Sequence, residues 1–170
     1  MFFKGLKEKS IQKAISKCNN LRELLDGNSK VKTIGFLINI DEVSITDSEL
    51  SSICNVLDSE NIGQLNFTKT VKKTNEESGL ISPKNIGWKA VLKHPDLKIF
   101  CQTQFDVLIT LTETDSIYLN AVNAFSQAKF KVSTTCNNEN LNDLLVATSP
   151  FKVDVFTSEL KKYLTILNKL

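Results

Sequence analysis

The amino-acid sequence predicts an α/β fold: a three-layer Rossmann-like domain with a four-stranded, mainly parallel sheet and long helices at both ends of the chain. Two runs, TIGFLINI at 33–40 and FDVLITL at 105–111, are apolar on both faces, as strands covered by helices on two sides are. Stretches of helical periodicity separate the strand-like runs, and this alternation is typical of right-handed parallel crossovers. Of 170 residues, 41% are hydrophobic and 24% charged, so we expect a single domain over 1–170.

Residues 3–25 have the pattern of a basic amphipathic helix. Apolar side chains recur every three or four residues, with lysines between them. The apolar stripe consists of Leu6, Ile11, Ala14, Ile15, Cys18, Leu21, Leu24 and Leu25. Gly27 and Asn28 suit the C-cap, so we assign 1–28 to this helix and 32–170 to an α/β body. Residues 1–32 contain eight Lys or Arg against three Asp or Glu, which makes this segment the basic part of the chain.

The first crossover unit follows. Thr46 and Glu49 have the spacing of a capping box at the start of a helix over 47–58. Gly63 is expected to permit the turn into a second strand with alternating apolar positions. The positions of that strand are Leu65, Phe67, Thr68 and Val71.

Residues 72–104 lose regular periodicity, and we expect a long irregular excursion with a short helix near 95–101. The third strand is 105–111, and Asp115 is placed to cap a helix over 116–128. The fourth strand is 130–134. We assume the strand order 2-1-3-4, numbered along the chain.

The C-terminal part is expected to be helical. Leu141–Leu145 is interpreted as a short helix, and a longer one covers about 154–168. The apolar stripe of the longer helix is Phe156, Leu160, Tyr163, Leu164 and Leu167.

Several stretches resemble an uncharacterised family of small bacterial α/β proteins, a domain of unknown function. They are KNIGWKAVLKHPDLKIF (84–100), FDVLITL (105–111), AKFKVS (128–133), NLNDLLV (140–146) and ELKKYLTILNKL (159–170). The resemblance implies a bacterial cytoplasmic protein and supplies no catalytic residues.

The composition argues against several classes of chemistry. The four cysteines are widely spaced, which indicates buried thiols in a reducing, cytoplasmic compartment. We expect no secretory signal and no membrane span. His94 is the only histidine and no glycine-rich phosphate loop occurs, so we expect no cofactor and no metal, and we lean against an enzyme.

One candidate ligand site is acidic. Asp41 and Glu42 follow the first strand, and Glu113 and Asp115 follow the third. Ligands of open parallel sheets bind outside the carboxyl ends of the strands, where these residues would meet. They could hold a hard cation such as magnesium, or serve a small-ligand-binding domain, a hydrolase or a transferase. The alternative is that Asp115 caps a helix and the others are ordinary polar loop residues.

The second candidate site is a partner-binding surface on the N-terminal helix and the segment around the only tryptophan. Its residues are Phe2, Phe3, Lys7, Lys9, Lys13, Trp88 and Lys89. The phenylalanines could enter a lipid interface, or the lysines could contact nucleic-acid phosphates or an acidic protein. Alternatively, the apolar stripe packs on the domain and Trp88 plugs an irregular segment onto the core. We favour a non-catalytic interaction protein that docks to a protein, a ribonucleoprotein or a membrane surface.

Overall fold

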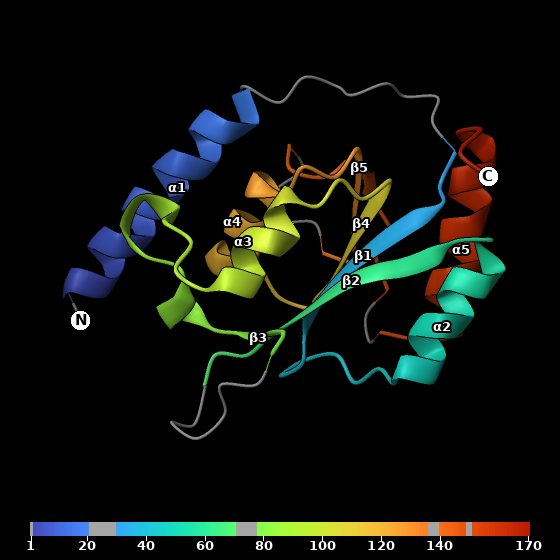
Figure 1. Cartoon of the computed structure of the whole chain (residues 1–170), viewed down its shortest axis with the longest axis horizontal. Helices are drawn as coiled ribbons and strands as arrows, with labels where there is room; N and C mark the ends of the chain where they lie inside the picture. Colours follow the sequence, from blue (N-terminus) through green and yellow to red (C-terminus); the bar gives the residue numbers. More distant parts are fainter. Residues whose placement is uncertain (1, 21–29, 71–77, 136–139, 149–150) are drawn as a thin grey trace.

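The computed structural model describes residues 2–20, 30–70, 78–135, 140–148 and 151–170. Within these ranges the chain is an α/β protein with a six-stranded parallel sheet and five α-helices (Figure 1). The strand order is β3-β2-β1-β4-β5-β6. No helix of the described ranges combines the length and the apolar composition that crossing a membrane requires.

The four predicted strands form the centre of the sheet, in the predicted order. They are β1 (Thr33–Asn39), β2 (Glu60–Phe67), β4 (Val107–Leu111) and β5 (Phe130–Ser133). The edge strands β3 (Leu80–Ile81) and β6 (Leu144–Leu145) were not predicted, because two residues carry no periodicity. The helix predicted over Leu141–Leu145 is wrong, since Leu144 and Leu145 pair with β5.

Helices cover both faces of the sheet. Helices α2 (Asp47–Val56) and α5 (Val153–Ile166) pack on one face, and α3 (Pro95–Gln102) and α4 (Ile117–Phe125) on the other (Figure 1). Successive side chains of β1 alternate between the two cores: Phe36 belongs to the core beneath α2 and α5, and Leu37 to the core beneath α3 and α4. This placement between two helical layers explains why β1 and β4 are apolar on both sides.

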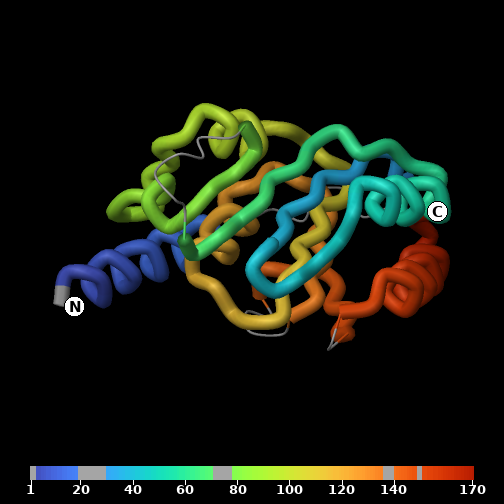
Figure 2. Tube along the Cα trace, turned by 90° about the horizontal axis from the view of Figure 1, so that it is seen from below, coloured from blue at the N-terminus to red at the C-terminus, as the bar shows by residue number. Residues whose placement is uncertain are grey.

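Helix α1 (Phe2–Asn20) lies outside the second helical layer. It packs on α4 and on the short 3-10 turn η2 (Trp88–Ala90) through the fully buried Ile11 and Ile15. Its N-terminal end extends past the body of the molecule (Figure 2). The predicted continuation to residue 25 and the cap at Gly27 and Asn28 lie outside the described residues.

Two glycines of the sheet serve packing. The ring of Phe105 covers Gly35 of β1 and Gly63 of β2, and a Cβ on either glycine would lie 2.8 Å from ring carbons. Gly63 therefore lies inside β2, so its predicted role in a turn before the strand is wrong. Thr68 follows the end of β2, and Val71 lies outside the described residues.

Most of the predicted helices begin close to the expected residue, and one predicted cap is wrong. Thr46 and Glu49 form the predicted capping box of α2. The predicted short helix is α3, and the excursion before it contains a 3-10 turn, η1 (Pro83–Asn85), in addition to η2. Asp115 does not cap α4, because Ser116 is the N-cap residue and the Asp115 carboxylate accepts a hydrogen bond of 2.7 Å from the Asn120 amide instead.

Candidate functional site

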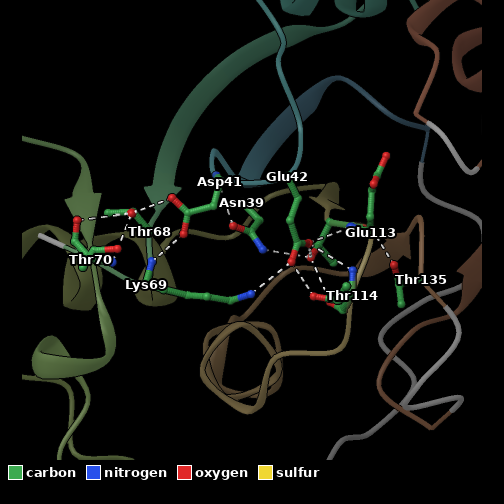
Figure 3. A network of polar contacts seen from close by, with 10 residues as sticks. Asn39, Asp41, Glu42, Thr68, Lys69, Thr70, Glu113, Thr114 and Thr135 are labelled. Carbon is green, nitrogen blue, oxygen red and sulfur yellow. Dashed lines mark hydrogen bonds and ion pairs between the residues drawn. The ribbon is translucent and has the colours of Figure 1, made fainter.

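The loop after β1 carries two carboxylates that point to opposite sides (Figure 3). β1 lies between β2 and β4, so each carboxylate can reach the loop after one neighbouring strand. Asp41 turns toward β2 and accepts hydrogen bonds from the Thr68 hydroxyl and the Lys69 backbone N–H, both at 2.7 Å. Asp41 thus ties the loop after β1 to the end of β2.

Glu42 turns toward β4 and fills a cradle of donors. Its carboxylate accepts hydrogen bonds from the Thr112 hydroxyl at 2.8 Å and from the backbone N–H groups of Glu113 and Thr114 at 3.0 Å each. The Thr114 hydroxyl donates a further bond, and Lys69 Nζ lies 3.3 Å away. Burial, the largest single influence, raises the pKa of Glu42, but the hydrogen bonds from Thr114, Thr112 and Glu113 together lower it to about 2.

The other two predicted acidic residues serve different segments. The Glu113 carboxylate accepts a hydrogen bond of 3.0 Å from the Phe151 backbone N–H. This bond joins the loop after β4 to the segment before α5. Asp115 bonds to Asn120. In the part of the chain that the structure describes, no group of three His, Cys, Asp or Glu side chains could hold a metal ion. The four carboxylates thus accept hydrogen bonds from different segments, and the ligand-binding role expected for them stays a prediction.

A groove runs along the exposed flank of α1. It has a volume of about 830 Å³, and its floor is apolar. The floor residues are Leu6, Ala14 and Cys18 of α1 and Phe125 of α4. The groove is also lined by Ser10 and by four lysines: Lys9, Lys13 and Lys17 from α1, and Lys89 from η2. The groove therefore combines accessible apolar surface with concentrated positive charge.

Hydrogen bonds fix the walls of this groove relative to α1. The Lys89 backbone N–H donates to the Ser10 hydroxyl at 3.0 Å, and the Cys18 thiol donates to the Ala124 carbonyl at 3.2 Å. Lys89 and Ala90 have φ values of 53° and 57°, a left-handed backbone conformation that residues other than glycine rarely adopt. The contact with Ser10 therefore holds the backbone of this turn against α1.

The predicted partner-binding residues divide into two groups. Lys9, Lys13 and Lys89 line the groove. Lys7 does not, because its ammonium donates to the Pro83 carbonyl at 2.8 Å and lies 5.3 Å from the centre of the Tyr118 ring. Burial, followed by repulsion from Lys93, lowers the pKa of Lys7.

The aromatic candidates lie at the surface of the same region. The Phe3 side chain is 76% exposed and Trp88 is 50% exposed. In η2 the side chain of Ala90 is buried, whereas that of Trp88 is exposed. The side chain of Phe2 lies outside the described residues.

Sequence reasoning missed five residues of this surface: Ser10, Ala14, Lys17, Cys18 and Phe125. Lys17 continues the four-residue repeat of Lys9 and Lys13, so a helical projection could have identified it. Phe125 comes from another helix, and its place beside Cys18 depends on how α1 packs on α4.

Comparison with known proteins identifies the family of the chain. No curated protein and no solved structure matches it. A family model described as "Family of unknown function (DUF6913)" matches residues 7–167, which include both acidic loops and nearly all of the groove. The match spans most of the sequence, so the chain belongs to this family of unknown function.

Proposed function

We propose that this chain is a non-catalytic interaction protein and that the α1 groove is where its partner binds. The observation that carries the proposal is that Lys9, Lys13, Lys17 and Lys89 line the same groove as the apolar floor. Accessible apolar surface favours a partner that covers it, and the lysines favour one with acidic side chains beside its apolar ones. The cytoplasmic location expected from the sequence is part of the same proposal.

A protein partner suits the groove better than a membrane or a nucleic acid. Helices that lie in a lipid interface turn their apolar stripe outward. In contrast, α1 turns Ile11 and Ile15 into the protein and presents Leu6, Ala14 and Cys18 within a groove. A phosphate backbone would use the lysines but would leave the floor uncovered. The exposed Phe3 keeps lipid binding as an outcome to be tested.

The alternative function, a small-ligand-binding domain, hydrolase or transferase, would use the acidic loops at the carboxyl ends of the strands. Its support is weaker. Asp41 and Glu42 are engaged with the loops on either side of them, and a catalytic or metal-binding role needs carboxylates that converge on one position.

The test compares charge reversal on the groove with the same charge change elsewhere. The groove variant carries Lys9→Glu, Lys13→Glu and Lys17→Glu. The matched control carries Lys98→Glu, Lys161→Glu and Lys162→Glu, whose exposed lysines lie on α3 and α5. Each protein is immobilised, exposed to nuclease-treated extract of its native cells and washed at increasing salt concentration.

We expect at least one protein to be retained by the wild type and the control and lost from the groove variant. The proposal fails if no retained protein distinguishes the groove variant from the control. It also fails if the groove lysines are needed only for RNA in an untreated extract, or only for sedimentation with anionic vesicles.

A further inference from the structure

We infer that the groove receives an amphipathic α-helix of the partner, with acidic side chains at four-residue spacing beside an apolar row. This inference rests on the proposed function and specifies the partner. It follows from the length of the groove, the order of its side chains and the position of its charges.

The groove has the length of a short helix. Its α1 residues run from Leu6 to Cys18, twelve residues apart, which spans about 18 Å at the rise of an α-helix. They fall into two neighbouring rows with four-residue spacing, so they occupy one continuous strip of the helix surface. One row is Leu6, Ser10, Ala14 and Cys18, and the other is Lys9, Lys13 and Lys17. A partner helix of three to four turns would cover the strip from end to end.

The side chains of α1 form parallel rows across this strip. Ile11 and Ile15 make the inner row, which is buried against the body. The next row is the floor, with Ala14 and Cys18, and the lysines form the outer row. An incoming helix would meet a complementary order, with its apolar row on the floor and an acidic row along the lysines.

The spacing of the charges favours a helix over an irregular acidic segment. Lys9, Lys13 and Lys17 repeat every four residues, which places neighbouring lysines about 5–6 Å apart along α1. Glutamates at positions i, i+4 and i+8 of a partner helix repeat at the same interval, so each can face one lysine. Lys89 adds positive charge from η2.

The probe is a pair of synthetic, fluorescently labelled peptides tested with the full chain. The first is a sixteen-residue design, about 24 Å long, with glutamates at i, i+4 and i+8 beside a row of leucines. The second has the same composition, but its glutamates lie on the face opposite the leucines. Binding is measured by fluorescence anisotropy at low and moderate salt concentrations.

We expect the first peptide to bind about tenfold or more tightly than the second. Lys9→Glu with Lys13→Glu and Lys17→Glu should weaken its binding by about tenfold or more, whereas the Lys98, Lys161 and Lys162 control should not. Ala14→Phe should also weaken binding, because it fills the floor without changing any charge. Leu6→Ser, at the half-exposed end of the floor, tests the same point if Ala14→Phe does not fold.

Three results would overturn the helix inference: no binding of either peptide, equal binding of the two peptides, or binding of the first peptide that neither floor substitution weakens. These failures differ from failure of the proposed function. If a protein from the extract depends on the groove lysines but neither peptide binds, the docking surface stands and its occupant is not an acidic amphipathic helix. If no protein in the extract depends on these lysines, the docking surface itself is refuted.

Discussion

Replacing Glu42 by glutamine removes the negative charge from the cradle at the end of β4 while keeping the side chain's size. The Glu42 side chain is only 12% exposed, and its carboxylate accepts bonds from two backbone N–H groups and two hydroxyls. A glutamine amide can accept with its oxygen alone, and its NH2 group would face donors. The lowering of the pKa from its ordinary 4.5 to about 2 corresponds to about 3 kcal/mol of folding free energy at neutral pH. We therefore expect Glu42→Gln to lower the free energy of unfolding by about 2–3 kcal/mol at pH 7.

The pH dependence of this loss has a definite sign. A carboxyl group whose pKa is lowered by folding stabilises the protein fully above its unfolded pKa, and the stabilisation is lost as the pH falls toward the folded pKa. For Glu42 that range extends from about 4.5 down to about 2. The wild type and Glu42→Gln should therefore differ most at neutral pH and become more alike as the solution is acidified.

The measurement is urea unfolding followed by far-ultraviolet circular dichroism at pH 7, 5, 4 and 3. Glu60→Gln serves as the control, because Glu60 is exposed at the start of β2 and loses the same charge on substitution. A difference from the wild type below about 1 kcal/mol at pH 7 would refute the reasoning. So would a difference that stays constant between pH 5 and pH 3, where the carboxylate's contribution should decline.

Three further substitutions test the packing and the caps, each by the free energy of unfolding in urea. Gly35→Ala should lower the free energy of unfolding by about 1–3 kcal/mol, because the new Cβ meets the Phe105 ring at 2.8 Å. The loss should be smaller in a Phe105→Leu background, and an equal loss in both backgrounds would contradict the contact. Thr46→Ala should cost about 1 kcal/mol by removing the capping box of α2, whereas Thr46→Ser should retain most of the stability. Lys131→Met should lower the free energy of unfolding by about 1–3 kcal/mol, because the ammonium of the buried Lys131 donates to carbonyls at the end of α4. An unchanged stability would show that these carbonyls find other donors.

The central fold was predictable because its signals are local and strong. β1 and β4 are apolar on both faces, and the α2 capping box is encoded by two side chains three residues apart. The edge strands β3 and β6 have only two residues each, so their pairing depends on the neighbouring strand and not on any pattern of their own. The role of Gly63 was misjudged for a related reason, because the ring that requires a glycine there belongs to Phe105, far along the chain.

The candidate sites were predictable as sets of residues and less so as geometry. The lysine repeat of α1 is visible in the sequence, and so is the adjacency of Trp88 and Lys89. The direction of a carboxylate is not, because Asp41 and Glu42 are neighbours that turn toward different strands. The use of Lys7 as a tie to Pro83 likewise depends on tertiary packing.

We expect α1 to open independently of the sheet. Because α1 rests mainly on α4 and η2, its release would expose Ile11 and Ile15 while leaving the pairing of the strands intact. Backbone amides of this helix would then exchange with solvent through a smaller opening than those of β1 and β4, which require global unfolding. A ligand bound in the groove between α1, α4 and η2 would oppose that opening. Binding would therefore slow the exchange of the backbone amides of α1 with solvent.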